Sequence, residues 1–367
     1  MSNKQCRWGF FGTAAIARKN WKAIRLSGNG RVAAVASRTA DRAQTFIDEC
    51  NDEYPAGCDV SAVGSYEGLL ERDDVDAVYI PLPTGLRKEW AIAAAAAGKH
   101  VLIEKPVANN SSDAAEIIAA CEDAGVQFMD GVMFDHSERL AKVKQQIGDG
   151  TTVGKLRRIN AHFSFAGDAE FQKSNIRVDS VLETHGCLGD LGWYCIRFIL
   201  QANGLVMPTS VSARTLTPLQ GENSPHCVPG EMSGELIFPD GVSAGFYCSF
   251  LTENHQRVSV SGDKGYIAIE DFVLPFYDSM AHWTTSSNTL EIDNCRWNFR
   301  RETVAHSIPE YASGEANSQE VKMLRTFNDL VLSGKRDPLY PELAIKTQRI
   351  LDACRKSDVS DGRPVQP

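Results

Sequence analysis

The stretch that decides the fold lies near the start of the chain and reads Trp8-Gly9-Phe10-Phe11-Gly12-Thr13-Ala14-Ala15-Ile16-Ala17. Its first four residues have the apolar composition of a buried strand, and a helical segment begins at Ala15. Gly12 lies in the turn between them, where a bare backbone allows a bound group to come close. The pattern therefore predicts a strand, a tight turn and a helix whose first N–H groups face an anion.

This turn is similar to the glycine-rich fingerprint GxGxxG, which binds the pyrophosphate of a dinucleotide. In the alignment Gly12 takes the tight turn, Ala14 replaces the second glycine, and Ala17 allows the helix to pack closely on the sheet. A glycine turn by itself can be only a tight loop, but this one opens a strand–helix–strand unit. We expect the pyrophosphate to lie against the five residues of the turn, which are Gly12, Thr13, Ala14, Ala15 and Ile16.

The first third of the chain alternates short β-rich runs with helical runs. We expect strands at 8–11, 32–37, 75–80, 101–104 and 126–130, and helices at 15–26, 40–50, 86–97 and 112–124. Gly28, Gly98 and Gly125 follow three of these helices, as is typical of C-terminal caps. Strict alternation predicts a doubly wound parallel sheet with helices on both faces, a Rossmann α/β domain over residues 1–130.

After about Gly131 the pattern changes, because polar and apolar residues alternate as they do in half-buried strands. Pro239-Asp240-Gly241 and Gly262-Asp263-Lys264-Gly265 each separate two β-rich runs, which predicts two hairpins. Helices are expected at 190–200, 318–332 and 342–357. These features predict a second, α+β domain over residues 131–367, built on an antiparallel sheet. No low-complexity linker separates the halves, and such junctions usually place a ligand cleft between domains.

The composition is that of an ordinary globular protein, and it narrows the function. The 367 residues are 43% hydrophobic, and the net charge of −9 disfavours binding to nucleic acid or to an anionic membrane. No apolar stretch approaches the ~20 residues of a membrane span, and the first residues do not resemble a secretory signal. The ten cysteines have no metal-binding spacing. We therefore expect a cytoplasmic protein with reduced thiols and no bound metal.

The end of the second predicted strand indicates which dinucleotide binds. An Asp or Glu there would hold the ribose hydroxyls of NAD, but the residues are Ser37, Arg38 and Thr39, with Arg42 one helical turn further on. A hydroxyl and guanidinium groups suit the 2′-phosphate of NADP(H), since Arg makes short charge-assisted hydrogen bonds to phosphate oxygens. The alternative is that Arg38 and Arg42 are solvated surface charges. We predict NADP(H) as the cofactor.

Several motifs occur in an order that is typical of one family. Glu104-Lys105-Pro106 ends the predicted strand at 101–104, and Asp190-Leu191-Gly192-Trp193-Tyr194 comes later. With the stretches at 8–17, 35–38 and 78–83, these motifs resemble the glucose–fructose oxidoreductase / inositol dehydrogenase / rhizopine catabolism (Gfo/Idh/MocA) family. The resemblance implies a Rossmann domain followed by an open, mainly antiparallel sheet, one face of which often forms an oligomer interface. It also implies hydride transfer between nicotinamide C4 and a carbon of a sugar, polyol, dihydrodiol or related carbonyl.

The resemblance further implies the roles of individual residues. Lys105 matches the active-site lysine of the family, and Asp190 and Tyr194 match a later pair. Reduction of a ketone needs a proton donor within reach of the oxygen, a role for Tyr194, whose pKa cationic Lys105 would lower. Lys105 can also hydrogen-bond the developing alkoxide, and Asp190 would orient the substrate or Lys105. The cofactor would also be bordered by residues that follow two strands, Pro81, Leu82, Pro83 and Glu104.

These assignments have structural alternatives. Tyr194 could be a core aromatic residue on an apolar helix, and Asp190 could be the N-cap of that helix. A structural role for Lys105, beside Pro106 at a strand end, is harder to find. His136 and His185 are candidate substrate-binding residues, although lone histidines are often structural.

Two residues depart from the family pattern in the loop that borders the nicotinamide. Thr84 stands where the family usually has Asn, and Arg87 stands where it often has His. These departures leave the orientation of the cofactor and the polarity of the substrate open.

The leading interpretation is an NADP(H)-dependent oxidoreductase that acts on CH–OH groups of sugar-like or dihydrodiol-like small molecules. One alternative is an enzyme that keeps NADP(H) tightly bound and moves hydride between two sugars. Another is an NADP(H)-binding sensor or regulatory protein without turnover. We expect a small-molecule substrate, no nucleic-acid or membrane partner, and a homo-oligomer, either a dimer or a tetramer.

Overall fold

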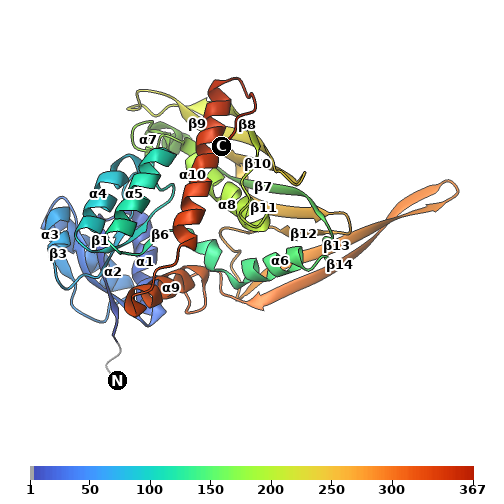
Figure 1. Ribbon diagram of the computed structural model, residues 1–367. Helices are drawn as coiled ribbons and strands as arrows, with labels where there is room; N and C mark the ends of the chain where they lie inside the picture. Colours follow the sequence, from blue (N-terminus) through green and yellow to red (C-terminus); the bar gives the residue numbers. More distant parts are fainter. Residues whose placement is uncertain (1–3) are drawn as a thin grey trace. The chain divides into compact units, whose positions relative to one another are not determined.

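The computed structural model describes residues 4–367 (Figure 1). The chain folds into two compact units. The first unit contains the residues up to His136, together with Asp179–Thr184 and Ser313–Gln348. The second contains Ser137–Val178, His185–Ala312 and the chain from Arg349 to its end. The expected boundary at residues 130/131 lies close to the first of these divisions. Two later segments nevertheless return to the first unit.

The first unit is built on a six-stranded parallel sheet. The strand order is β3-β2-β1-β4-β5-β6, and every pairing in it is parallel. The strands are β1 (Cys6–Phe11), β2 (Gly30–Ala36), β3 (Ser61–Val63), β4 (Ala77–Ile80), β5 (His100–Ile103) and β6 (Phe128–Asp130). This is the doubly wound order, and the chain reverses its winding between β1 and β4. Ligands of such sheets bind at the carboxyl ends of the strands at this switch point.

Three helices of this unit begin at a side chain that caps them, and several end at a glycine. They are α1 (Ala15–Ser27), α2 (Ala40–Glu53), α3 (Tyr66–Leu70), α4 (Thr84–Ala96), α5 (Ser111–Asp123), the 3-10 turn η1 (Met133–His136) and α9 (Gln319–Ser333). Thr39, Ser65 and Asn110 each accept a hydrogen bond from a first-turn N–H group as N-caps. Gly28, Gly98 and Gly125 have positive φ, which confirms the expected glycine punctuation. The pattern did not indicate the short β3 and α3.

Helix α9 belongs to the first unit because its apolar face is part of that unit's core. Phe327 packs on Trp8 of β1, with ring centroids 5.0 Å apart. Trp8 Nε1 also donates to Oδ1 of the fully buried Asn328, at 2.8 Å. The core of the first unit therefore includes residues that are more than 300 positions apart in the sequence.

The second unit is built on an eight-stranded sheet of order β14-β13-β12-β11-β7-β10-β9-β8. Only the pairing of β7 with β10 is parallel, and the other six pairings are antiparallel. The strands are β7 (Leu156–Ala166), β8 (Ser210–Leu219), β9 (Val228–Ile237), β10 (Ser243–Ser249), β11 (Leu251–Gly262), β12 (Tyr266–Ile269), β13 (Met280–Asp293) and β14 (Arg296–Pro309). This sheet confirms the predicted architecture, and both predicted hairpins are present as β9–β10 and β11–β12.

The helical elements of the second unit include α6 (Glu138–Gly148), α7 (Ala169–Ser174), the 3-10 turn η2 (Ile176–Val178), the π-helical turn η3 (Leu188–Gly192) and α8 (Trp193–Ala202). The last helix, α10 (Leu339–Val359), begins in the first unit and ends in the second. No helix formed by residues 4–367 combines the length and the apolar character that a membrane span requires.

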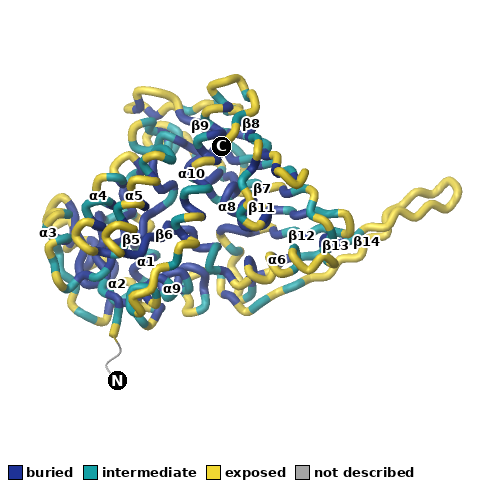
Figure 2. Tube along the Cα trace, in the orientation of Figure 1, coloured by how far each residue is buried: buried dark blue, intermediate teal, exposed yellow. Residues whose placement is uncertain are grey.

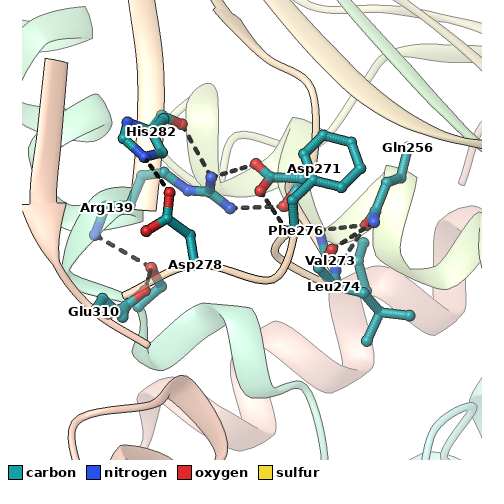
Figure 3. Close-up of polar contacts among 10 residues, drawn as sticks. Arg139, Gln256, Asp271, Val273, Leu274, Phe276, Asp278, His282 and Glu310 are labelled. Atoms are coloured by element: carbon teal, nitrogen blue, oxygen red, sulfur yellow. Dashed lines mark hydrogen bonds and ion pairs between the residues drawn. The ribbon is translucent and has the colours of Figure 1, made fainter. Parts of the chain in front are cut away.

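The loop between β12 and β13 is fastened by buried polar groups (Figure 3). Arg139 of α6 forms an ion pair with Asp271 and donates to the carbonyl oxygen of Asp271 at 2.7 Å. Gln256 of β11 accepts hydrogen bonds from two further N–H groups of this loop. These bonds pair three backbone groups of the loop with side chains of other elements, so tertiary contacts help to set its position.

Strands β13 and β14 continue beyond the rest of the sheet as a two-stranded arm. Strand β12 pairs with β13 only through residues 266–268, opposite 284–286. Residues 287–302 therefore pair only with each other, and we call this segment the β13–β14 arm. Figure 2 shows that the arm is exposed beyond its base, and every residue from 288 to 302 is exposed.

Candidate functional site

The turn after β1 has the geometry that a pyrophosphate requires. Gly12 has φ of +89°, and its N–H donates to the carbonyl oxygen of Ala36 at 2.8 Å. The positive φ favours glycine at this position, and a Cβ there would also lie tightly against Tyr66 Oη, at 3.3 Å. Ala14 is the N-cap of α1 and has no side-chain oxygen to cap it. No side chain therefore caps the first N–H groups of α1, which agrees with a phosphate there; the predicted contacts of Gly12 to Ile16 stay a prediction.

The residues predicted to bind the 2′-phosphate follow the end of β2, next to the end of β3. Arg42 Nε donates to Thr13 Oγ1 at 3.2 Å, which joins the start of α2 to the glycine turn. Burial raises the pKa of Tyr66, and the positive charges of Arg38 and Arg42 oppose this shift. Both guanidinium groups therefore lie near one phenol. Ser37 is buried beside them, and its N–H donates to the carbonyl oxygen of Val63.

Tyr66 is a residue of this site that sequence reasoning missed. Its ring stacks on Phe11 of β1, with centroids 5.0 Å apart and planes 4° apart. Trp90 of α4 meets it edge-on, at 4.9 Å. A Tyr directly after an N-cap Ser gives no cofactor signal by itself. Only the pairing of β3 with β2 brings it to the glycine turn.

The end of β5 holds the predicted lysine beside a buried carboxylate. Glu104 Oε1 accepts a hydrogen bond from Tyr79 Oη at 2.6 Å, and Oε2 accepts one from the N–H of Lys105 at 3.3 Å. Burial raises the pKa of Tyr79 well above its ordinary value, and the charge of Glu104 adds to this. Gly131 leaves room for the carboxylate, because a Cβ there would lie 3.0 Å from Glu104 Oε1. Glu104 therefore anchors the backbone from which half-buried Lys105 extends.

The two departures from the family pattern, Thr84 and Arg87, lie in one buried cluster. Both are on the first turns of α4, directly after the Pro81–Pro83 loop. Thr84 donates to the carboxylate of Glu183 through its N–H at 3.1 Å and through Oγ1 at 2.6 Å. Arg87 donates to the carbonyl oxygens of Leu82, at 2.6 Å, and of Pro106. Sequence reasoning gave Glu183 no role, because 96 residues separate it from Arg87.

Asp190 and Tyr194 lie on the helical segment that opens with the π-helical turn Leu188–Gly192. The helix begins at Leu188, so Asp190 is not its N-cap and that alternative is wrong. Asp190 Oδ2 forms an ion pair with Arg177 Nε at 2.7 Å, a partner that the sequence did not indicate. Its carboxylate is therefore held in place by a cation within the second unit.

Tyr194 is the partly exposed residue of an otherwise buried helix. Every other residue of α8, all of them described, is buried. The Tyr194 ring meets Phe163 of β7 edge-on, with centroids 5.7 Å apart. A residue that served only to fill the core would be buried like its neighbours, so this exposure favours the functional interpretation of Tyr194.

The two candidate substrate-binding histidines belong to different units. His136 ends η1 in the first unit, and its ring stacks on Tyr340 with centroids 5.6 Å apart. His185 is buried in the second unit, five residues before Asp190. The predicted catalytic set divides in the same way, with Lys105 in the first unit and Asp190 and Tyr194 in the second. Within residues 4–367, no group of three or more His, Cys, Asp or Glu side chains is arranged to hold a metal ion.

Family models match both units. Residues 6–132 match the model of an oxidoreductase family with an NAD-binding Rossmann fold, GFO_IDH_MocA. Residues 140–268 match the model of the GFO/IDH/MocA C-terminal domain. The two matches follow one another along the chain and cover the switch point, the Lys105 segment and the segment of Asp190 and Tyr194.

Curated relatives extend this similarity to most of the chain. A dTDP-3,4-didehydro-2,6-dideoxy-α-D-glucose 3-reductase from Actinomadura kijaniata is 36% identical over 95% of this chain and 94% of its own. A D-xylose 1-dehydrogenase (NADP(+)) from Haloferax volcanii is 32% identical over 70% of this chain and 74% of its own.

A solved structure matches over nearly the full length. It is a Tyr-to-Phe mutant of KijD10, a 3-ketoreductase from A. kijaniata in complex with TDP-benzene and NADP. The TM-score is 0.78 and the sequence identity 26%, with 97% of this chain and 98% of that chain covered.

Proposed function

The chain belongs to the Gfo/Idh/MocA family of oxidoreductases, and on that premise we propose that it is an NADP(H)-dependent enzyme of sugar-like substrates. The reaction is hydride transfer between the nicotinamide and a carbonyl or hydroxyl carbon, with a dihydrodiol-like molecule as the other substrate class. The predictions of the family, the fold class and the oxidoreductase activity are confirmed.

The pair of arginine side chains after β2, Arg38 and Arg42, is the main observation in favour of NADP(H). Arg38 and Arg42 lie near Tyr66, and Arg42 is hydrogen-bonded to Thr13 of the glycine turn. In a Rossmann fold the end of the second strand faces the ribose, and two guanidinium groups there would suit a 2′-phosphate rather than the ribose hydroxyls of NAD. The D-xylose dehydrogenase is NADP-dependent, and the solved 3-ketoreductase was crystallised with NADP. Both agree with the predicted NADP(H) cofactor.

Three side chains carry the remaining chemistry in this proposal. The bound dinucleotide supplies or accepts the hydride. Tyr194 donates a proton to the substrate oxygen in reduction, and the ammonium of Lys105 stabilises the charge that develops on this oxygen. Asp190, held by Arg177, orients the substrate. His136 and His185 are proposed to bind substrate hydroxyl groups.

NADPH oxidation by the purified protein tests the proposal. Keto-sugars, including nucleotide-linked ones, are assayed beside osones, dicarbonyls and aromatic ketones. Tyr194→Phe removes the proton donor but keeps the ring that contacts Phe163, and Tyr277→Phe, in an exposed loop, is the matched control. We expect turnover by the wild type and by Tyr277→Phe, and a loss of about 10²-fold or more in Tyr194→Phe. Equal turnover by both variants would remove Tyr194 from the mechanism.

The absorbance of the purified protein separates the two enzymatic versions of this proposal. An enzyme that releases its cofactor in each cycle is purified largely without NADP(H). An enzyme that moves hydride between two sugars retains about one equivalent through purification.

We further propose that the protein is a homo-oligomer, a dimer or a tetramer, and that it works in the cytoplasm. The β13–β14 arm supports the first proposal. Leu290 and Ile292 on β13 pair with Phe299 and Trp297 on β14, and all four side chains are exposed. The ten cysteines are all free, and most of them are buried, which supports a reducing compartment.

A further inference from the structure

Helix α4 and a distant segment of the chain form a polar cluster around two buried side chains, Thr84 and Arg87, that the proposed chemistry does not use. The segment is Asp179–Thr184, which belongs to the first unit although the residues on both sides of it belong to the second. We call it the strap. Its partners in the cluster are Thr84, Gly85 and Arg87, on the first turns of α4.

Three hydrogen bonds join the strap to the N-terminus of α4, and a fourth joins it to Asn109, before α5. The N–H of Gly85 donates to the carbonyl oxygen of Leu182 at 3.0 Å. A Cβ at Gly85 would lie closer to the carbonyl oxygen of Val181 than van der Waals contact allows, so only glycine admits the strap. Glu183 accepts the two hydrogen bonds from Thr84, and Thr184 donates to Asn109 at 3.0 Å.

Glu183 serves as the cap of α4 from a distance. The N-cap residue of α4 is Pro83, which has no side-chain acceptor. The carboxylate of Glu183 satisfies the first N–H group of the helix and places a negative charge at the positive end of the helix dipole. The same carboxylate lies 4.0 Å from the guanidinium of Arg87.

Arg87 joins the two loops that border the predicted nicotinamide site. Its side chain is only 6% exposed, and it donates to the carbonyl oxygens of Leu82 and Pro106. Leu82 is the middle residue of the loop after β4, and Pro106 follows Lys105 after β5. A buried cation needs a counter-ion, and Glu183 is within ion-pair distance. Residues 82 and 106 are thus held by one planar cation whose position depends on the strap.

We propose that Arg87 is a positioning residue, which sets the loop after β4 and the backbone of Lys105 relative to each other, with Glu183 as the anion that holds it. The inference rests on the proposed function for the role of Lys105. It explains why Arg stands where the family often has His. A guanidinium has five N–H donors in a rigid fork, so it can bind two carbonyl groups and a carboxylate at once, whereas an imidazole cannot.

The direct test compares Arg87→Ala, Arg87→Lys and Glu183→Gln with a matched control, Arg72→Ala. Arg72 also forms an ion pair, with Asp74, but contacts Ser61 at the start of β3, the opposite edge of the sheet. We measure kcat per NADPH-binding site, counted by fluorescence titration, so that misfolded protein does not contribute. We expect about a tenfold or greater loss in Arg87→Ala, a smaller loss in Arg87→Lys and Glu183→Gln, and no loss in Arg72→Ala.

Two further readouts separate positioning from general stability. Guanidinium ion at millimolar concentration should restore part of kcat in Arg87→Ala but not in Arg72→Ala, because only the first variant leaves a cavity beside the two carbonyl groups. Unchanged kcat per binding site in Arg87→Ala, with a fall in Tm like that of Arg72→Ala, would mean that the cluster only stabilises the fold.

Hydrogen exchange tests the inference without turnover. The N–H groups of Thr84, Lys105 and Val107 should exchange faster in Arg87→Ala than in the wild type, both with NADPH bound. If no substrate in the panel is turned over but these amides respond, the inference on Arg87 stands and the proposed reaction does not. If the amides do not respond, the inference fails whatever the activity.

Discussion

In the proposed function, the charge of individual side chains at the end of β2 sets the preference for one dinucleotide over the other. Arg38 and Arg42 lie near the phenol of Tyr66, close to the glycine turn after β1. Neither guanidinium has a carboxylate partner among the ion pairs of the described residues. Both are therefore available to the phosphate group that distinguishes NADP(H) from NAD(H).

Arg38→Ala is expected to reduce the preference for NADPH. Loss of one charge-assisted bond to phosphate, worth about 1.5–3 kcal/mol, should raise the Kd for NADPH about tenfold to hundredfold. The Kd for NADH should stay within about a factor of two. Fluorescence titration with both nucleotides measures the ratio, and Arg31→Ala, at the start of the same strand, is the control. An unchanged ratio would exclude Arg38 from the 2′-phosphate site.

Some individual residues of the candidate site were predicted from sequence motifs, and others were not. Gly12 and Arg38 were predicted because they lie next to a strand end, where the local backbone decides what a side chain can reach. Tyr66 and Glu183 were not predicted, because their positions depend on how a later strand and a distant segment pack. Arg177, the partner of Asp190, was missed for the same reason.

At the scale of elements, α9 is the clearest case of a helix whose location the sequence did not indicate. The apolar periodicity predicted a helix at 318–332, and α9 covers Gln319–Ser333. Its apolar face packs against the first unit, and its neighbour in the fold is α1, not the sheet of the second unit. Local periodicity predicts that a face is buried, but it does not determine which partner buries it.

Asn328→Ala is expected to destabilise the first unit. Asn328 is fully buried, accepts from Trp8 Nε1 and donates to Ser27 Oγ and Asn29 Oδ1. Its loss leaves a buried indole N–H and two acceptors without this partner, so the free energy of unfolding should fall by about 2–3 kcal/mol. Denaturant unfolding measures the change. Asp329→Ala, on the same helix but in an exposed contact with Asn29, should cost less than about 0.5 kcal/mol. If both variants lowered the free energy of unfolding equally, the buried hydrogen bonds of Asn328 would not be the cause of the loss.

The start of the helix with Asp190 and Tyr194 is a second element that only packing decides. A helix from residue 190 was predicted, whereas a π-helical turn opens it at Leu188. Gly192 lies in this turn, where a Cβ would be 2.9 Å from Leu188 Cδ1 and 3.3 Å from Cys248 Sγ. The wide turn thus depends on a close approach to β10, and this contact has no local sequence signature. Such turns are frequent at functional sites.

In the molecule as a whole, the β13–β14 arm stands out because its apolar side chains are exposed in a single chain. Cross-strand partners share a face, so the pairs Ile292–Trp297 and Leu290–Phe299 form one apolar face. The opposite face carries Arg300, whose ion pairs with Glu291 and Glu302 satisfy its charge within the arm. A second copy would present the same apolar face, so two arms can bury these faces symmetrically.

Charges on the apolar face of the arm are expected to dissociate the proposed oligomer. Trp297→Glu combined with Phe299→Glu should shift the mass measured by light scattering after size-exclusion chromatography to that of one chain, 40.2 kDa. Thr289→Glu, on the opposite face, should leave the mass unchanged. An oligomer that persists in the double variant would place the interface elsewhere, such as on the open sheet.

The amino-acid sequence was enough to predict the doubly wound first unit, the glycine turn, the basic residues at the end of β2 and the order of family motifs. Each of these depends on residues that are close in the chain, where periodicity, turn chemistry and charge act locally. Three features became visible only in the folded chain: α9 completes the core of the first unit, Tyr66 lies by the basic residues, and Glu183 caps α4 beside Arg87. These contacts join residues far apart in the chain, and they form because buried charges and N–H groups must find partners wherever the fold brings them.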